Sequence, residues 1–165
     1  MKENNLKNTY FLAYGAVIAA IYVALTMAFQ PISFGPVQFR ISEALCILPF
    51  FTPAAIPGLF VGCLIGNILG GAILPDIVFG SIATLIGAFF TWKLREQKPV
   101  VATFPPIISN IIIVPFVLRY GYGVTLPIPF MMLTVGIGEV ISCTVLGLIV
   151  YGALKKYKST LFRTA

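Results

Sequence analysis

Acidic side chains within apolar sequence are the first residues of this chain that could do chemistry. Glu43, Asp76 and Glu139 lie in or beside long apolar stretches, whereas Glu3 and Glu96 lie in polar segments. Ionisable groups within membrane spans are costly, and they usually mark a substrate or ion path. We therefore take the first three carboxylates as candidate ligands of a substrate.

Glu139 lies about ten residues into an apolar stretch with no adjacent cation, so its carboxylate needs hydrogen-bond donors, a ligand or a proton. Arg40 precedes Glu43 by three positions. The two side chains can share a helix face, either as a structural salt bridge or as part of a site. Asn67 and Asn110 are amides within apolar stretches, where an amide either ties helices together or binds a ligand.

The segment 30–40 joins two apolar stretches and carries Phe34 and Phe39 among two prolines and a glycine. Proline and glycine favour a fixed, non-helical loop. This loop could be a lid with aromatic faces, or its rings could anchor it at the membrane interface. Tyr120, in a later connection, allows the same two interpretations.

The elements that position these residues follow from composition. The chain has 165 residues, of which 59% are hydrophobic and 10% charged, against about 25% charged in an ordinary soluble domain. A membrane helix takes about 20 apolar residues, so about six spans would use most of the chain. We expect residues 1–165 to form one all-α domain, an integral membrane bundle of six transmembrane helices.

Prolines at 49, 53 and 57 divide one long apolar run into two short spans, because proline removes a backbone donor and disfavours helix in the residue before it. The six spans are predicted at 10–29, 41–53, 55–71, 76–92, 100–118 and 129–154.

Orientation follows from the cations, because short loops rich in Lys and Arg stay cytoplasmic. With six spans and a cytoplasmic amino terminus, nine of the 11 cations fall inside, and only Arg40 and Arg119 fall outside. Both termini are therefore predicted to be cytoplasmic. The basic tails are topology signals on this interpretation, and we expect no nucleic-acid partner.

Small residues recur every four positions in two of the predicted spans. The first span carries Ala16, Ala20 and Ala24. The third span carries Gly58, Gly62, Gly66 and Gly70. Such stripes allow close helix approach in lipid. The alanines could pack internally or dock another protein, whereas the glycines of a central helix favour internal packing.

Several kinds of chemistry are excluded. The chain has no histidine, which removes His-based triads and metal sites. It has no Gly-x-x-x-x-Gly-Lys-Ser/Thr phosphate loop, so it would not hydrolyse ATP by that machinery. Its cysteines, Cys46, Cys63 and Cys143, lie in apolar stretches and are interpreted as small packing residues. We expect no metal and no cofactor.

Four segments resemble the QueT family of integral membrane proteins: GPVQFRISEAL (35–45), PFFTPAAIPGLFVGCLIGNILGG (49–71), DIVFGSIATLIGA (76–88) and GEVIS (138–142). That family comprises substrate-binding S components of energy-coupling factor (ECF) transporters, thought to take up queuosine precursors. The resemblance implies a six-helix protein of the bacterial cell membrane with both termini inside. It also implies as partners a transmembrane coupling protein, docked through Ala16, Ala20 and Ala24, and two cytoplasmic ATPases.

The implied substrate, a 7-deazaguanine base, has a ring N–H beside an amino group, a carbonyl oxygen and a flat face. Glu139 is the first choice to accept two hydrogen bonds from the N–H edge. Glu43 or Asp76 would hold the aminomethyl cation of a prequeuosine base. The carbonyl could be reached by Asn67, Asn110 or Arg40. The rings that could stack on the base are Phe34, Phe39 and Tyr120.

Other classes remain open from the sequence. The chain could be an S component for another vitamin-like small molecule. It could be a membrane-embedded enzyme that uses Glu43, Asp76 and Glu139 as acids and bases, although it lacks histidine and a nucleophile motif. It could also be a small channel or structural protein that self-associates through its alanine stripe.

Overall fold

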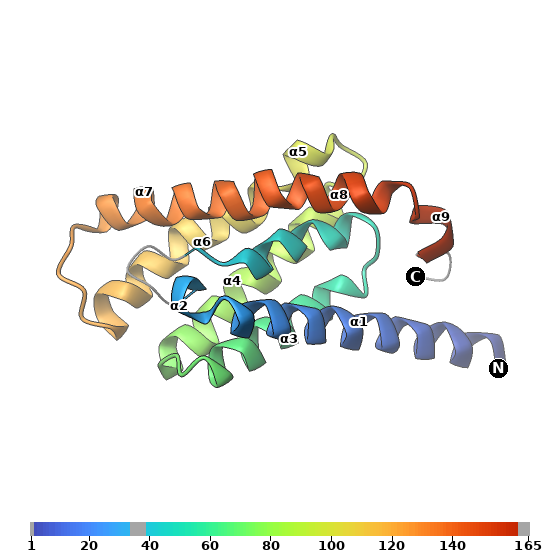
Figure 1. Cartoon of the computed structure of the whole chain (residues 1–165), viewed down its shortest axis with the longest axis horizontal. Coiled ribbons are helices and arrows are strands. Elements are labelled where there is room, and N and C mark those ends of the chain that lie inside the picture. The colour runs from blue at the N-terminus through green and yellow to red at the C-terminus, as the bar shows by residue number, and fades with distance from the viewer. Residues whose placement is uncertain (1, 34–38, 162–165) are drawn as a thin grey trace.

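The computed structural model describes residues 2–33 and 39–161, and every regular element in these ranges is a helix (Figure 1). The elements are, in chain order, α1 (Lys2–Ala28), α2 (Gln30–Ser33), η1 (Ile41–Phe50), α3 (Ala55–Leu69), α4 (Leu74–Lys93), α5 (Pro99–Ala102), α6 (Phe104–Phe116), η2 (Val117–Gly121), α7 (Ile128–Glu139), η3 (Val140–Leu146), α8 (Gly147–Lys155) and α9 (Lys158–Leu161). The predicted all-α class is therefore confirmed.

Four helical stretches are long and apolar enough to cross a membrane. They cover Lys7–Ala28, Leu74–Lys93, Pro99–Gly121 and Ile128–Lys155. Two shorter apolar helices, Ile41–Phe50 and Ala55–Leu69, occupy the positions of the second and third predicted spans. All six apolar helices thus lie where the sequence places them, with ends that differ by a few residues.

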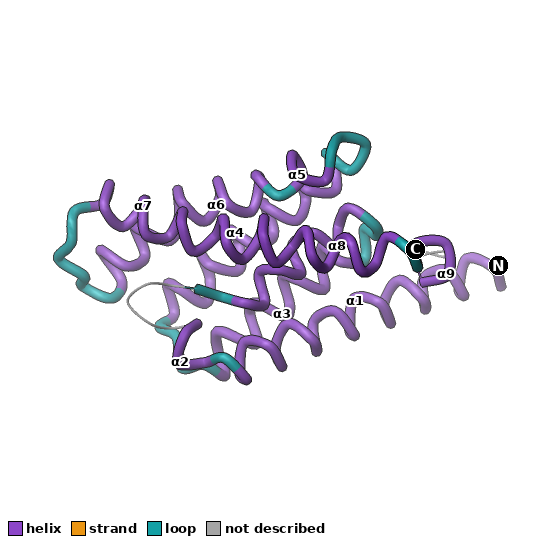
Figure 2. The backbone as a smooth tube through the Cα atoms, turned by 45° about the horizontal axis from the view of Figure 1, so that its top comes forward, coloured by secondary structure: helices purple, strands orange, loops and turns teal. Residues whose placement is uncertain are grey.

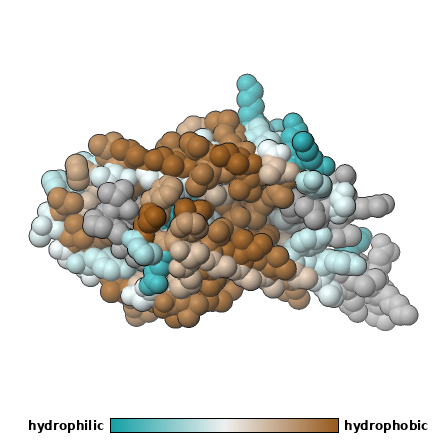
Figure 3. All heavy atoms as spheres, in the orientation of Figure 1, coloured by the Kyte–Doolittle hydropathy of each residue, from teal (hydrophilic) through white to brown (hydrophobic). Residues whose placement is uncertain are grey.

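Successive long elements run in opposite directions along the bundle (Figure 1). The start of α1, the turn between η1 and α3, the α4–α5 connection and α9 lie at one end. The end of α1, the α3–α4 connection and the α6–α7 connection lie at the other. Between the two ends, the face shown in Figure 3 carries a broad belt of apolar side chains, as expected for a surface against lipid.

Helices α1 and α3 pack closely along the glycine seam of α3. A Cβ atom added at Gly58 would lie 2.7 Å from the main-chain oxygen of Gly15, and one at Gly62 would lie 2.8 Å from the Cβ of Tyr22. Only glycine allows backbones this close. The prediction that the glycine seam packs internally is confirmed for this contact.

The alanine stripe lies on the opposite face of α1. Ala16, Ala20 and Ala24 are exposed, whereas Ala19 and Tyr22 are buried against α3. Intramolecular packing of the three alanines, one of the two interpretations left open above, is therefore excluded within the described bundle.

The centre of the bundle is η1, a 3₁₀ helix that contacts α1, α4, η3 and α8 (Figure 2). Residues Ser42 through Phe50 are all buried. A 3₁₀ helix rises about 2.0 Å per residue, so these ten residues span about 20 Å, whereas an α-helix of that length would span about 15 Å. The tight winding gives this short element more reach through the core.

Two other departures from regular α-helix adjoin the polar interior. Residues Val117–Gly121 and Val140–Leu146 form π-helical turns, which are often found at functional sites. The expectation of a non-helical loop over 30–40 is wrong for Gln30–Ser33, which form one helical turn. Pro31 is compatible with it, because proline is tolerated in the first turn of a helix.

Candidate functional site

Four charged side chains are buried together with polar partners in the interior of the bundle: Arg40, Glu43, Asp76 and Glu139, of which Arg40 is the most exposed at 8%. Among the described residues this makes one buried cation against three carboxylates, a formal charge of 1 − 3 = −2. Buried charge of one sign is costly unless it is paired, protonated or bound by a ligand.

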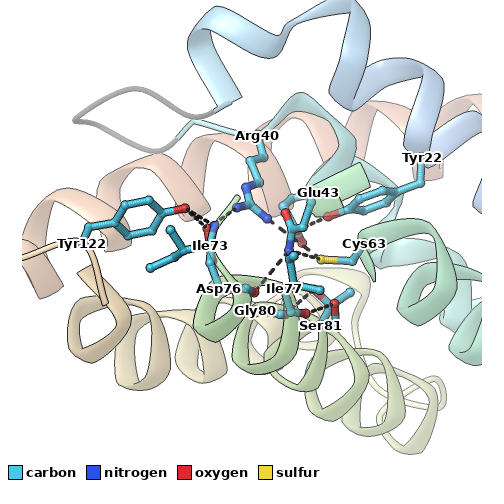
Figure 4. A network of polar contacts seen from close by, with 12 residues as sticks. Tyr22, Arg40, Glu43, Cys63, Ile73, Asp76, Ile77, Gly80, Ser81 and Tyr122 are labelled. Atoms are coloured by element: carbon cyan, nitrogen blue, oxygen red, sulfur yellow. Dashed lines mark hydrogen bonds and ion pairs between the residues drawn. The ribbon is translucent and has the colours of Figure 1, made fainter. Parts of the chain in front are cut away.

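Arg40 and Asp76 form the part of the cluster nearest the α6–α7 connection. Arg40 Nη2 lies 3.6 Å from Asp76 Oδ2, and the hydroxyl of Tyr122 donates a hydrogen bond of 2.9 Å to the same oxygen. The main-chain N–H of Ile73 donates to the Tyr122 hydroxyl at 3.4 Å. Tyr122 therefore ties the α6–α7 connection to the α3–α4 connection across Asp76 (Figure 4).

The pKa of the Tyr122 phenol is raised above its usual value, first by partial burial and then by the nearby Asp76 carboxylate. Both effects disfavour the phenolate. Tyr122 therefore stays a hydrogen-bond donor to Asp76 at neutral pH.

Glu43 lies on the other side of Arg40 and receives two donors. The Tyr22 hydroxyl of α1 donates to Oε1 at 2.5 Å, and the Cys46 thiol donates to Oε2 at 2.8 Å. Tyr22 and Tyr122 thus approach the cluster from opposite sides (Figure 4). Both of these donors to the Glu43 carboxylate are neutral groups, and they fix its position beside Arg40.

Glu139 is the last residue of α7 and lies on the side of this helix that faces η1. The Cys143 thiol lies 3.2 Å from Glu139 Oε2 as a donor, and 3.6 Å from the main-chain oxygen of Glu43. The Asn110 side chain of α6 lies close to the Glu139 carboxylate. Cys143 therefore links the two glutamates, and the π-helical turn η3 that contains it begins directly after Glu139.

Asn67 holds the α3 side of the cluster. Its Nδ2 lies 3.3 Å from the main-chain oxygen of Asp76 and 3.6 Å from the sulfur of Cys63. Arg40 Nη1 reaches the same sulfur at 3.9 Å. The amide and the guanidinium are therefore neighbours around Cys63.

The structure brings together six of the nine residues that the sequence singles out for substrate binding: Arg40, Glu43, Asn67, Asp76, Asn110 and Glu139. Tyr120 does not join them, because it is 78% exposed and stacks on Phe116. Phe39 is half-buried in the chain that leads to Arg40, and Phe34 lies outside the described residues.

The cysteines were expected to be packing residues only, and this interpretation is incomplete. All three are free and buried, and they also supply contacts to the charged groups. The spacing was visible in the sequence: Cys46 follows Glu43 by three positions and Cys143 follows Glu139 by four, and both spacings place two side chains on one helix face. Tyr22 carried no such signal.

Metal-binding atoms also gather here. One oxygen of Glu43 and the sulfurs of Cys46 and Cys143 lie within 4.8 Å of one another. Each thiol already has a carboxylate as acceptor, so a metal ion would have to displace two S–H···O bonds.

Three apolar grooves are described on the surface, two between α4 and α6 and one between α6 and α7. None of the three is lined by Arg40 or by the buried carboxylates. The charged cluster is thus separate from these grooves. Its chemistry suits a ligand that carries hydrogen-bond donors and positive charge, which three carboxylates would attract.

The family model described as QueT transporter matches residues 12–156. The queuosine precursor transporter QueT of Lactococcus lactis subsp. cremoris (strain MG1363) is 40% identical over 80 residues, which cover 47% of this chain and 47% of that protein. The match thus spans about half the length of this curated relative. No solved structure matches the chain.

The family match extends from α1 to the end of α8 and includes all six apolar helices and every charged residue of the buried cluster. Together with four long apolar helices, it identifies a multi-pass membrane protein. The chain belongs to the QueT transporter family.

Proposed function

We propose that this chain captures a queuosine-precursor base, a 7-deazaguanine such as a prequeuosine base or queuine, as the S component of an ECF transporter in a bacterial cell membrane. The family match and the name of the Lactococcus relative support the substrate class. The single structural observation that carries the proposal is the buried cluster of one cation and three carboxylates.

The charge of this cluster favours a cationic form of the base. One cation, Arg40, stands against three carboxylates, which leaves a negative excess. The hydrogen-bond donors described for Glu43 and Glu139 are thiols and a phenol, which are neutral. A protonated aminomethyl group would offset part of that excess and donate to a carboxylate. A hydrogen bond to a charged group contributes about 1.5–3 kcal/mol, which is roughly a tenfold to hundredfold gain in affinity.

Six passes with both termini in the cytoplasm are part of the proposal. The ends of the bundle differ in charge: the first end holds Lys7, Lys93, Arg95, Lys98, Lys155, Lys156 and Lys158. The second end has Arg40 and Arg119. The positive-inside rule makes the first end cytoplasmic. Helices η1 and α3 are shorter than the hydrocarbon core, which local bilayer thinning or flanking residues would accommodate.

Titration calorimetry of the purified chain in detergent tests the substrate. The ligands are the aminomethyl and nitrile forms of the prequeuosine base, queuine and guanine. We expect micromolar or tighter binding of the aminomethyl base and at least tenfold weaker binding of the nitrile base, which keeps the ring but lacks the cation. Failure of every deazaguanine to bind at micromolar concentration would overturn the substrate class.

Orientation is tested by labelling intact cells with a membrane-impermeant maleimide. Leu126→Cys, in the α6–α7 connection, is expected to react, whereas Glu96→Cys, in the α4–α5 connection, reacts only after the cells are permeabilised. The reverse pattern would invert the proposed topology.

Partner docking is assigned to the exposed alanines of α1. Ala16, Ala20 and Ala24 leave a shallow strip between bulkier exposed side chains such as Val17 and Ile21. In lipid, such a strip lets another helix approach closely. The partners are a transmembrane coupling protein and two cytoplasmic ATPases, which would supply the ATP hydrolysis.

A matched pair of tryptophan variants tests docking. Ala20→Trp fills the strip, whereas Ile149→Trp adds a similar ring to the exposed face of α8. Both variants are expected to bind the aminomethyl base as wild type does. Only Ala20→Trp is expected to lose copurification with the coupling protein. Copurification of Ala20→Trp at the wild-type level would refute the docking assignment.

A further inference from the structure

The amide of Asn67 has a fixed orientation. Its Nδ2 faces the main-chain oxygen of Asp76 at 3.3 Å, and a carbonyl oxygen can only accept, so the NH₂ group must be on that side. The Oδ1 atom is thereby turned away from Asp76. It is buried and accepts no hydrogen bond from any residue that the structure describes. Asn67 itself is 1% exposed.

A buried acceptor without a donor is unfavourable, and each such atom in a native protein needs an explanation. Asn67 was expected from the sequence to donate to a substrate carbonyl. The structure occupies its donor side and leaves the acceptor side open. A ligand at this position must therefore supply an N–H or O–H group.

The neighbours of Asn67 define the rest of the ligand. Arg40 Nη1 and Asn67 Nδ2 both contact Cys63 Sγ, at 3.9 and 3.6 Å, so the guanidinium and the Asn67 amide are neighbours around this sulfur. Figure 4 shows Arg40 and Cys63 on this side of the cluster. Arg40 is itself paired with Asp76, so the group formed by Arg40, Asp76 and Asn67 is neutral overall. A neutral part of the ligand is better suited to it than the cationic group, for which Glu43 and Glu139 are available.

Gly80 of α4 lies next to Asp76 and Asn67 and leaves space beside them, because it has no side chain. A Cβ atom at Gly80 would lie 3.1 Å from Asp76 Oδ1 and 3.3 Å from Asn67 Nδ2, tighter than ordinary contact. A side chain there would press on both polar groups. Glycine at this position thus leaves the face of α4 without a side chain where Asn67 and Asp76 meet.

We propose that Asn67 and Arg40 together read a lactam: Arg40 donates to the carbonyl oxygen of the substrate, and Asn67 Oδ1 accepts the adjacent ring N–H. The inference rests on the proposed function and adds a specificity-determining role for Asn67. An amino-imine, as in an adenine-type ring, presents a donor to the guanidinium and an acceptor to Oδ1, so both contacts become unfavourable. A site with such fixed buried groups discriminates strongly between the two ring types.

Two ligands that differ only at this edge test the inference on the wild-type chain. The first is the aminomethyl 7-deazaguanine base, and the second is its 2,6-diamino counterpart, which retains the 2-amino and aminomethyl groups. Calorimetry is expected to show at least ~100-fold weaker binding of the second. Equal affinities would overturn the lactam assignment while leaving the proposed substrate class intact. Binding of neither base would overturn both.

The Asn67→Leu variant tests the residue itself. It removes the acceptor with little change in volume, and it is expected to weaken binding of the lactam base at least tenfold and to narrow the preference over the 2,6-diamino base. Thr91→Val is the matched control. It removes a buried hydrogen bond to the main-chain oxygen of Ala102 (2.9 Å) at the opposite end of α4, and wild-type affinity is expected.

An Asn67→Leu protein that binds and discriminates like wild type would refute the role of Asn67. If this variant does not fold, the comparison of the two ligands on the wild-type chain still decides whether a lactam is read.

Discussion

Removing the only buried cation of the described cluster should be more damaging than removing the acid it pairs with. Arg40→Met takes away the guanidinium and keeps an unbranched apolar stem, so the local charge changes from −2 to −3. Asp76→Asn keeps the shape of the side chain and the acceptor for Tyr122, and it changes the charge to −1. The starting charge follows from one buried cation and three buried carboxylates.

The magnitude follows from the cost of breaking a buried ion pair. Removing one partner typically destabilises a protein by about 3–5 kcal/mol, because the other charge is left uncompensated. Arg40→Met should reach this range. Asp76→Asn also relieves repulsion among the acids, so it should cost less than half as much. At about 2–4 °C per kcal/mol for a chain of this size, Arg40→Met is expected to lower the unfolding temperature by roughly 6–20 °C.

Thermal unfolding in one detergent, followed by circular dichroism, measures both variants. Arg119→Gln is the matched control, because Arg119 is the other cation of this end of the bundle and is exposed. It should change the stability by no more than about 0.5 kcal/mol. If Asp76→Asn destabilises as much as Arg40→Met, the charge balance does not control the stability of the cluster, and the reasoning is refuted.

Three further predictions concern separate parts of the molecule. Gly62→Leu should lower the unfolding temperature, because its Cβ alone would lie 2.8 Å from that of Tyr22 and overpacking costs about 1–3 kcal/mol or more; an unchanged unfolding temperature would contradict the close packing. Glu139→Gln should weaken binding of the aminomethyl base about tenfold to hundredfold in calorimetry, with Glu96→Gln as an exposed control and equal affinities as the opposing result. Tyr122→Phe should lose less stability than wild type between pH 8 and 11. The pKa of Tyr122 is raised in the folded protein, so its contribution to the free energy of unfolding is complete below the unfolded-state pKa of about 10. That contribution is lost as the pH rises through the folded-state pKa. Parallel unfolding curves for wild type and Tyr122→Phe would count against this.

Much of the architecture was predictable because the bilayer restricts it. Apolar runs of about 20 residues can be read directly from the sequence. The predicted division of the second run is confirmed, although only Pro53 lies between η1 and α3, whereas Pro49 lies within η1 and Pro57 within the first turn of α3. The glycine seam was also predictable, since four-residue spacing places small side chains on one face. These features depend on local sequence alone.

The site was predictable as a set of residues and not as a set of contacts. Charge scarcity identifies Arg40, Glu43, Asp76 and Glu139, because few other charges lie in apolar sequence. Their pairing was not accessible: Arg40 is three positions from Glu43, and the sequence does not reveal that it also forms an ion pair with Asp76 of α4. Which acid approaches the guanidinium depends on how α4 packs against η1, and no local spacing encodes that contact.

Tyr120 and Tyr122 show the same limit on a smaller scale. Two positions separate them, and both belong to the α6–α7 connection, so sequence reasoning treats them alike. The π-helical turn at Val117–Gly121 ends between them. Tyr120 consequently stacks on Phe116 at the surface, and Tyr122 turns inward to Asp76.

Irregular winding lies at or directly after two of the three buried acids, Glu43 and Glu139, whereas Asp76 lies on the regular helix α4. Glu43 lies on a 3₁₀ helix, Glu139 precedes a π-helical turn, and the turn at Val117–Gly121 precedes the Tyr122 that binds Asp76. A regular α-helix rotates 100° per residue and fixes which side chains share a face. A 3₁₀ or π turn changes that rotation. Here such turns lie at or directly after the pairs Glu43–Cys46 and Glu139–Cys143, whose spacings of three and four positions place each pair on one helix face. Because these turns sacrifice good backbone geometry, their coincidence with two of the buried acids indicates that the fold gives up regular helix to hold this cluster in place.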